Sequence, residues 1–433
     1  MNLFRNKKSD LLSITHSSHA RKGVYTKRLR YYWDESHIDA RNLIAQRYSR
    51  PDQFRIFSIN IVRAIADKRA STYRLSPRRT FIGMDQATGD ALYQAMNADS
   101  VLQKGSRYLE VCKTVMLQVG WDEQADIPTL NVLTPNVIDV TYTNPERPEQ
   151  VIVTFPADHA DDYIYHAWTT ETFQVLNSRG AQLPILGNAD NVNPYSVLPF
   201  VPWFERVPDN QFFIPGGDDL IAAQDALNVG LASLWRAVEF QSSGQAWASG
   251  ISANEVLQFG PDRAIALPAG GQFGFAAPNA PIGDIVSALS FVMRQTAAVY
   301  GCGEDMFDLS KVAQSGSAKY AGRLDLKEVR QNAIAQARTM EARLFEVLKA
   351  VVNAHKPGTI PDKATLGIDF AGLQDQMSEA ELLANAQIKA ELGIFSPVDV
   401  LMATSPDAYP DRQSAFQELK RRSDEAAALG LPL

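Results

Sequence analysis

Three long helical patterns between residues 216 and 355 constrain this chain most strongly. Apolar side chains recur at the helical period over residues 218–248, 281–300 and 320–355. Helices of roughly 20 to 35 residues would be about 30 to 50 Å long. None of the three carries a catalytic constellation, which indicates a subunit with a mechanical task in an assembly. The alternative is that each is an ordinary core helix of a large α-rich domain.

The ends of these helices carry local signals. The first is predicted to begin after Gly216 and Gly217, where Asp218 or Asp219 can accept hydrogen bonds from free backbone N–H groups. The second is predicted to end at residues 301–303, Gly-Cys-Gly, because glycine adopts the left-handed conformation without steric cost. Four polar residues of the first helix are predicted to lie off its buried stripe: Gln224, Asp225, Asn228 and Ser233.

Two connections between the helices differ in composition. Residues 249–280 are rich in glycine and proline and contain two short β-like runs, 255–259 and 263–267. This pattern predicts a small strand-containing excursion that leaves along one helix and returns along the next. Residues 311–319 are small and polar, as in a mobile loop or a plain helix–helix connection.

The rest of the chain predicts a sheet and a helical tail. Runs rich in β-branched and aromatic residues, separated or ended by turn formers, predict a mostly antiparallel sheet. These runs are 129–134, 137–142, 150–155, 162–168 and 172–176. Three helices follow near the C-terminus. They are predicted from a capping box at Ser378 with closure at Gly393, from Ser396-Pro397, and from the segment after Pro410.

Charge is distributed unevenly along the chain. Residues 1–80 hold 18 Lys and Arg against 6 Asp and Glu, although the whole chain has a net charge of −7. Such a basic region can bind nucleic acid phosphates or an acidic neighbour, or its charges can lie on solvated faces and in salt bridges between subunits. Alternating basic and apolar residues over 47–69 also predict an amphipathic helix there.

Signals for enzyme chemistry are sparse. The sequence contains no phosphate-binding G-x-x-x-x-G-K-[S/T] loop, no H-E-x-x-H and no G-x-S-x-G. Cys302 is interpreted as a small buried residue at a helix end rather than a nucleophile. Two distant cysteines, no long apolar run and no apolar leader predict a soluble protein of a reducing cytoplasm, without disulfides.

The order of these elements resembles that of the portal proteins of tailed bacteriophages, also called head-to-tail connectors. The matching phrases are residues 197–203 (Val-Leu-Pro-Phe-Val-Pro-Trp), then Gly-Asp-Asp-Leu at 217–220, then Ser-Gly-Ser-Ala at 315–318. The resemblance covers roughly residues 30–430, and the order and spacing of the phrases carry it. This chain departs from the family in its compact length and in its Gly-Gly-Asp-Asp turn.

The resemblance implies an α+β, portal-like fold with long stem helices, a β-rich wing, a small clip insert and a helical C-terminal crown. Residues 1–217 would form the wing, which includes the basic N-terminal region and the β-rich segment. The first stem helix would occupy 218–248, the clip 249–280, the second stem helix 281–301 and the tunnel loop 302–318. Residues 319–376 would form the long helix and the return to the wing, and 377–433 the crown.

The resemblance also implies a function and partners. Portal proteins form a ring of about twelve subunits at one capsid vertex, through which DNA is packaged and ejected. The expected partners are other copies of the chain, double-stranded DNA held transiently and without sequence specificity, the terminase large subunit, the major capsid and scaffold proteins, and a neck or tail adaptor protein. The expected location is the virion, after synthesis in the host cytoplasm. No cofactor, metal or membrane is expected.

A DNA conduit must contact a polyanion without holding it, because clustered Lys and Arg contacts bind tightly through counterion release. The predicted stem segments are poor in cations, and the carboxylates predicted to line the channel are Asp218, Asp219, Asp225, Glu239, Asp284, Glu304, Asp305 and Asp308. The residues predicted to make transient phosphate contacts from the tunnel loop are Lys311, Gln314, Ser315, Ser317 and Lys319.

Two other classes of protein remain open. Another virion structural or head-tail adaptor protein would share ring assembly but would lack an insert between two stem helices. A nucleic-acid-processing enzyme would need an acidic metal cluster or a nucleotide loop, and metal-dependent DNA cleavage by the purified protein would reveal it.

Overall fold

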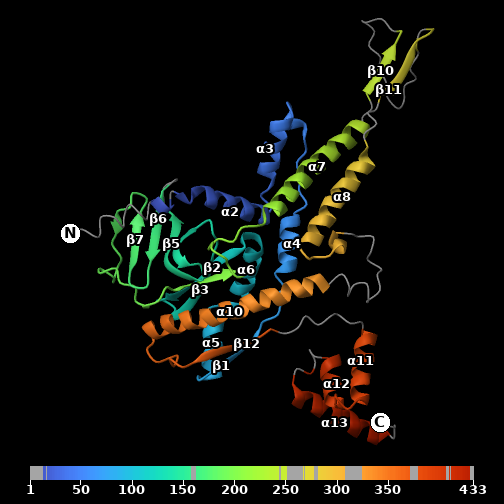
Figure 1. Cartoon of the computed structure of the whole chain (residues 1–433). Coiled ribbons are helices and arrows are strands. Elements are labelled where there is room, and N and C mark those ends of the chain that lie inside the picture. Colours follow the sequence, from blue (N-terminus) through green and yellow to red (C-terminus); the bar gives the residue numbers. More distant parts are fainter. Residues whose placement is uncertain are drawn as a thin grey trace. The chain divides into compact units, whose positions relative to one another are not determined.

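The structure is a computed structural model that describes residues 13–15, 17–157, 162–242, 245–250, 267, 269–276, 281–307, 324–370, 379–405, 409 and 411–429. The chain divides into two compact units, one of Met1–Leu309 with Asp325–Ala371 and one of Ser310–Leu324 with Gly372–Leu433. The first unit contains helices and sheets (Figure 1), so the predicted α+β class is confirmed.

The three predicted long helices are present in the first unit. Its α-helices are α2 (His19–Tyr32), α3 (His37–Arg47), α4 (Ile61–Arg69), α5 (Gln86–Ala95), α6 (Ala98–Cys112), α7 (Asp218–Ser242), α8 (Ile282–Val299) and α10 (Leu324–His355). Two 3-10 turns accompany them, η1 (Pro51–Gln53) and η2 (Glu304–Phe307). Gly301 has a φ of 66° and follows the end of α8, as its predicted capping role requires.

Every strand pair of the described residues is antiparallel. One sheet has the order β3 (Ile127–Leu133), β2 (Thr114–Asp122), β9 (Phe200–Phe204), and a second runs in chain order through β4 (Ile138–Asn144), β5 (Arg147–Pro156), β6 (Tyr163–Trp168), β7 (Phe173–Asn177) and β8 (Gln182–Leu183). Two further pairs join β1 (Arg78–Ile82) to β12 (Thr365–Asp369), and β10 (Gln245–Ser249) to β11 (Gln272–Ala276).

The five predicted strands are confirmed as β3 to β7, but they belong to two sheets rather than one. The chain leaves the first sheet after β3 and returns to it only at β9, which pairs with β2. All five residues of β9 are buried, and they lie within the Val-Leu-Pro-Phe-Val-Pro-Trp phrase and just after it. That phrase therefore leads into a core strand. A short apolar run without alternation does not by itself distinguish such a strand from a buried helix segment.

Two predicted helix boundaries are wrong. The first long helix ends at Ser242 rather than residue 248, because residues 245–249 pair with β11, where Trp247 packs over Gly274. The predicted helix over 47–69 is helical only from Ile61, where the Asn60 side chain accepts from the Arg63 N–H. Before it lie the η1 turn, which begins at Pro51, and extended chain. The predicted strands at 255–259 and 263–267 lie outside the described residues, apart from Leu267, which is not in a strand.

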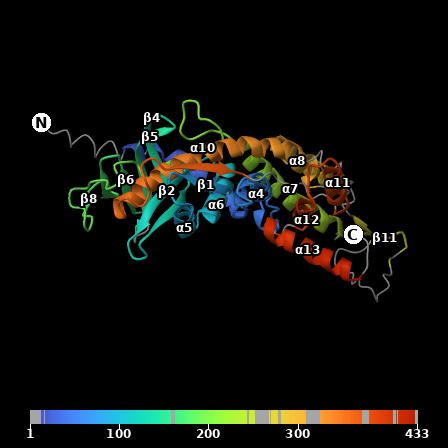
Figure 2. The same ribbon diagram turned by 90° about the horizontal axis from the view of Figure 1, so that it is seen from below.

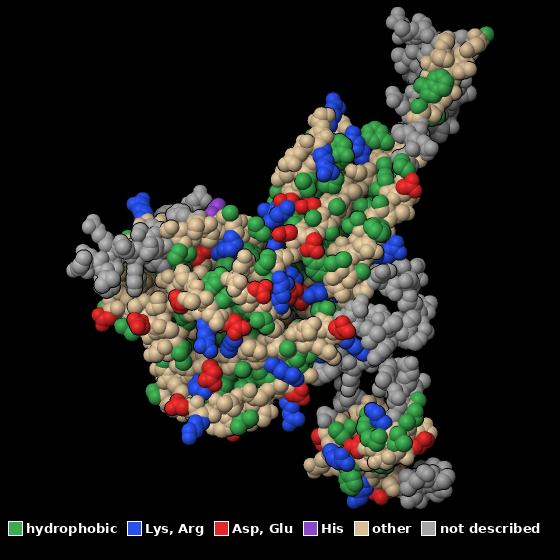
Figure 3. Space-filling model, viewed as in Figure 1, with side chains coloured by type: hydrophobic (Ala, Val, Ile, Leu, Met, Phe, Trp, Pro, Cys, Tyr) green, Lys and Arg blue, Asp and Glu red, His purple; other side chains and the backbone are tan. Residues whose placement is uncertain are grey.

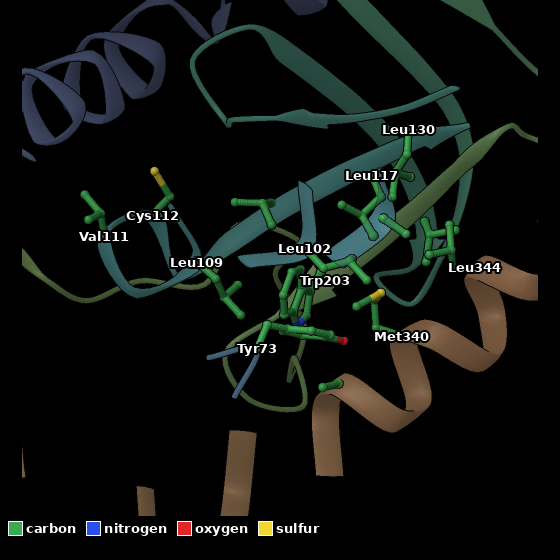
Figure 4. Packing of buried hydrophobic residues seen from close by; sticks show 14 of the residues in the cluster. Tyr73, Leu102, Leu109, Val111, Cys112, Leu117, Leu130, Trp203, Met340 and Leu344 are labelled. Carbon is green, nitrogen blue, oxygen red and sulfur yellow. The ribbon is translucent and has the colours of Figure 1, made fainter. Parts of the chain in front are cut away.

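The main core lies between α6, the sheet of β3, β2 and β9, and α10. Figure 4 shows Met340 and Leu344 of α10 facing the sheet residues Leu117 and Trp203. Tyr73 packs edge-on against Trp203, with ring centroids 5.6 Å apart. Long-range contacts of this kind fix α10 against the body of the first unit.

A buried ionic cluster joins α10 to β1. Glu341 is fully buried on α10 and accepts hydrogen bonds from Arg79 Nε at 2.7 Å and from the Tyr73 hydroxyl at 2.9 Å. Arg79 also pairs with Asp99 at 2.7 Å, at the start of α6. Phe81 of β1 packs against Phe345 of α10 beside this cluster, and α10 runs alongside β1 in both views (Figure 1, Figure 2). Burial, together with the nearby Glu341 carboxylate, raises the pKa of Tyr73 well above its usual range.

The described part of the second unit is helical, as predicted for the tail. It consists of α11 (Glu379–Glu391), α12 (Pro397–Thr404) and α13 (Arg412–Leu429). Ser396 and Asp399 form a reciprocal capping box at the start of α12, and Gly393 after α11 has a φ of 68°.

Candidate functional site

The candidate site is the pair of helices α7 and α8, with the β10–β11 hairpin between them in sequence (Figure 1). The two helices pack closely at Gly230 of α7. An added Cβ there would lie only 2.4 Å from the Leu289 side chain of α8, so a larger residue would not fit. Leu227 and Leu231 of α7 are buried in the same cluster as Ile61 of α4. The pair is therefore packed along one side and attached to the body at its base.

An ionic joint holds both helices at that base. Arg69, at the end of α4, pairs with Glu110 of α6 at 2.6 Å and with Glu205 at 3.3 Å. Arg69 also donates to the carbonyl of Tyr300, directly after α8. The Tyr300 hydroxyl donates to Asp219 of α7 at 2.7 Å. Burial, assisted by this hydrogen bond, raises the pKa of Tyr300. The joint thus connects the end of α8 and the start of α7 to α4 and α6.

A buried polar network fixes α7 further along, at two residues that were predicted to lie off the buried stripe. Gln224 and Asn228 are fully buried, so that assignment is wrong. The Gln224 carbonyl accepts from the Ile61 N–H at 2.8 Å, and its amide donates to the Ile59 carbonyl and to Asn228. Asn228 in turn donates to the Ser36 hydroxyl at 3.0 Å. The helical pattern places polar side chains on the exposed faces of the helix, and for this reason it did not predict that Gln224 and Asn228 are buried.

Replacing Gln224 with leucine is expected to lower the free energy of unfolding by about 2–3 kcal/mol. The substitution keeps the volume but removes the buried acceptor of the Ile61 and Val62 N–H groups and leaves the buried Asn228 Oδ1 without its donor. Urea denaturation of the full chain measures the change. Gln94→Leu, at an exposed position on α5, is the matched control and should change stability by less than about 0.5 kcal/mol. Equal effects of both substitutions would contradict a role for the network.

Helix α2 connects the second sheet to α7 through ion pairs. Arg21 and Lys22 both contact Asp139 of β4, with Arg21 at 2.6 Å. Farther along the helix, Lys27 pairs with Asp225 at 3.2 Å and Arg28 pairs with Asp218 at 2.6 Å. Much of the basic N-terminal charge is therefore compensated by salt bridges within the chain, whereas the alternative to nucleic acid binding expected salt bridges between subunits.

The carboxylates predicted to line a channel lie in different surroundings. Asp218 and Asp225 carry the ion pairs with α2, Asp219 accepts from Tyr300, and Glu239 accepts from Trp235 Nε1 at 2.7 Å. Asp284 is exposed in the first turn of α8. The others are not placed, because the side chains of Glu304 and Asp305 and the whole of Asp308 lie outside the described residues.

The predicted tunnel loop can be followed only at its beginning. Cys302 and Gly303 lead into η2, which ends at Phe307. The predicted phosphate contacts all lie outside the described residues: Lys311, Gln314, Ser315, Ser317 and Lys319.

Helix α8 is apolar yet poorly covered. Its 18 residues include only two charged side chains, Asp284 and Arg294, but Ala297 is its only buried residue. Val286, Phe291 and Val299 are 46%, 58% and 75% exposed. No helix within the described residues is long and apolar enough to cross a membrane. Exposed apolar surface of this extent on a helix is typical of a protein–protein interface.

Within the described residues of this site, groups suited to catalysis do not gather. Cys302 is buried, and burial raises the pKa of its thiol to about 11, so the thiolate that a nucleophile needs is not favoured. Across the ranges that the structure describes, no three His, Cys, Asp or Glu residues are grouped to hold a metal ion.

Comparison with known proteins gives distant structural likenesses. No protein-family model matches the sequence, and no curated protein matches it. A chain of the virion of a native gene transfer agent (GTA) particle is similar with TM-score 0.47 and 12% identity, covering 86% of this chain and 89% of that chain. A chain from the neck of an empty GTA particle, computed with C6 symmetry, gives 0.46 and 14% over the same shares.

A third likeness is to a chain from the neck of a native GTA particle, computed with C12 symmetry. Its TM-score is 0.41 at 13% identity, covering 79% of this chain and 88% of that chain. TM-scores this low do not establish a shared fold, so no function follows from them.

Proposed function

We propose that this chain is the subunit of a portal-type ring through which double-stranded DNA passes. In this proposal α7 and α8 form the stem, the β10–β11 hairpin belongs to the clip, and α11 to α13 belong to the crown. The ring has about twelve copies, the number that the resemblance to portal proteins implies.

The observation that carries the proposal is the exposed apolar surface of α8. This helix has only one buried residue and exposes Val286, Phe291 and Val299 to solvent. In a cyclic assembly, the neighbouring subunit would bury this apolar surface in the same way on every copy. The anchoring of both helices at the Arg69 joint supports this role, since a stem must keep its geometry under load. The ordered phrases of the sequence point to the same class of protein.

The charge of the stem pair is compatible with passing DNA. Arg236 and Arg294 are the only Lys or Arg residues in α7 and α8. Few cations mean few released counterions and weak retention of the duplex. Asp219, Glu239 and Asp284 would then keep the channel wall mildly acidic, while Asp218 and Asp225 contribute less because α2 neutralises them. The tunnel-loop residues 311–319 would supply transient phosphate contacts.

The partners follow from the same proposal. The clip would dock the terminase large subunit during packaging and a neck or tail adaptor protein afterwards. The major capsid and scaffold proteins would surround the ring at its vertex in the virion.

The test is the assembly state of the full chain. Mass measurement in solution and electron microscopy are expected to show closed rings with an axial hole wide enough for duplex DNA. A compact monomer at every concentration, with or without added scaffold protein, would contradict the proposal. Rings without an axial hole would instead favour another virion structural protein.

A second experiment addresses the loop. Replacing Lys311 with glutamine and both Gln314 and Ser315 with alanine is expected to impair DNA packaging or DNA retention while rings still form. Rings of this variant that package and retain DNA normally would remove the functional role assigned to the loop.

A further inference from the structure

Basic residues of the N-terminal region differ in their surroundings. Those of α2 have carboxylate partners within the chain, as described above. By contrast, Arg47, Arg50 and Arg55 are exposed and form no ion pair with another described residue. Figure 3 shows Lys and Arg side chains gathered at the end of the lobe formed by α3 and α7. These three arginines are called the arginine cap below.

Aromatic side chains accompany the arginine cap. The Arg55 guanidinium lies 5.5 Å from the centre of the Trp235 ring, and Phe57 packs edge-on against the same ring. Tyr48 packs against Phe54 with centroids 4.5 Å apart. Tyr48, Phe57 and Trp235 remain 42%, 38% and 38% exposed. Arginines beside half-exposed aromatic rings are the composition of the energetically dominant part of a protein interface.

The cap is built on packed elements, so its side chains start from a fixed backbone. Ile44 of α3, Phe54 and Ala232 of α7 form a buried cluster beneath it. Arg236 of α7 lies over the Phe54 ring at 4.4 Å and donates to the Gln53 side chain at 3.0 Å. The segment that carries Arg50 and Arg55 is therefore held against α7, which reduces the entropy lost on binding.

We propose that the arginine cap docks an acidic segment of a partner protein. Carboxylates of that segment would pair with the three guanidinium groups, and apolar side chains between them would cover Tyr48, Phe57 and Trp235. Duplex DNA fits this surface less well, because its phosphates could pair with the arginines but its stacked bases could not cover the rings. The surface belongs to the single chain, and its binding can be measured whether or not the chain forms a ring.

The experiment uses a fluorescent peptide of repeated Glu-Glu-Leu units and a fluorescent DNA duplex of similar net charge. Their dissociation constants are measured by anisotropy for the full chain at low and moderate salt. The triple variant Arg47→Gln, Arg50→Gln, Arg55→Gln is expected to bind the peptide about tenfold or more weakly. The matched control is Lys68→Gln, Arg74→Gln, Arg78→Gln, which removes three exposed cations outside the cap and should change affinity less than about twofold.

Each other outcome overturns the proposal. Equal losses in both triple variants would mean that overall charge, and not this surface, attracts the peptide. Tighter binding of the duplex than of the peptide, lost with the same three arginines, would make the cap a nucleic-acid surface. No binding of the peptide by the unaltered chain would exclude the docking role. Thermal unfolding of both variants is measured first, and unchanged midpoints show that the fold is intact.

Discussion

Replacing Glu341 with alanine is expected to lower the free energy of unfolding by about 3–5 kcal/mol, a large effect for one substitution. Glu341 is fully buried and accepts from Arg79 Nε and Nη2, at 2.7 and 3.1 Å, and from the Tyr73 hydroxyl. Without it, the buried Arg79 guanidinium keeps only the partly exposed Asp99, and the Tyr73 hydroxyl loses its acceptor. Urea or thermal denaturation of the full chain measures the loss.

The same helix provides the control. Glu346 of α10 pairs with Lys349, but its side chain is 61% exposed, so Glu346→Ala should lower the unfolding free energy by less than about 1 kcal/mol. Glu341→Gln keeps the shape and one acceptor and should fall between the two. A Glu341→Ala variant as stable as the Glu346→Ala variant would mean that the cluster contributes no net stability.

Replacing Phe291 with aspartate is expected to abolish assembly while the chain stays folded. Phe291 is 58% exposed on α8 in the single chain, so the substitution removes little intrachain packing. In a ring it would place an unpaired carboxylate in every subunit interface, which costs several kcal/mol each time. The concentration needed for assembly should rise at least about 100-fold, as measured by analytical ultracentrifugation or mass photometry.

Leu186→Asp is the matched control for this experiment. Leu186 is also an exposed apolar residue, but it lies outside the stem pair, and its replacement should leave the mass distribution unchanged. Circular dichroism and the unfolding midpoint should be similar for both variants. Rings of normal mass from the Phe291→Asp variant would show that α8 does not form the interface.

These two substitutions separate the two duties of the long helices. Within one chain, Glu341 fixes α10 to β1, and the Arg69 joint fixes α7 and α8 to α4 and α6. Val286, Phe291 and Val299 of α8 stay exposed in the single chain. Glu341→Ala is therefore expected to lower stability without preventing assembly. Phe291→Asp is expected to prevent assembly without lowering stability.

The sequence by itself determined the local elements, because their signals lie within a few residues of one another. The helical period placed α7, α8 and α10, and runs of β-branched and aromatic residues between turn residues placed β3 to β7. The start of α12 at Pro397 and the left-handed Gly301 were also readable from the sequence, whereas the capping box predicted at Ser378 lies outside the described residues. The end of α7 was misplaced, because the local sequence does not mark where the helix ends and strand β10 begins.

Only the tertiary structure decided which partners these elements find. Two sheets arise because β9 pairs with β2 rather than with its neighbours in sequence. Gln224 is buried because its bonding partners come from Ile59 and Ile61, more than 160 residues away in the chain. Arg21 and Arg28 of α2 meet carboxylates that follow them by more than 100 positions. Burial and charge pairing depend on such distant contacts, which no local pattern encodes.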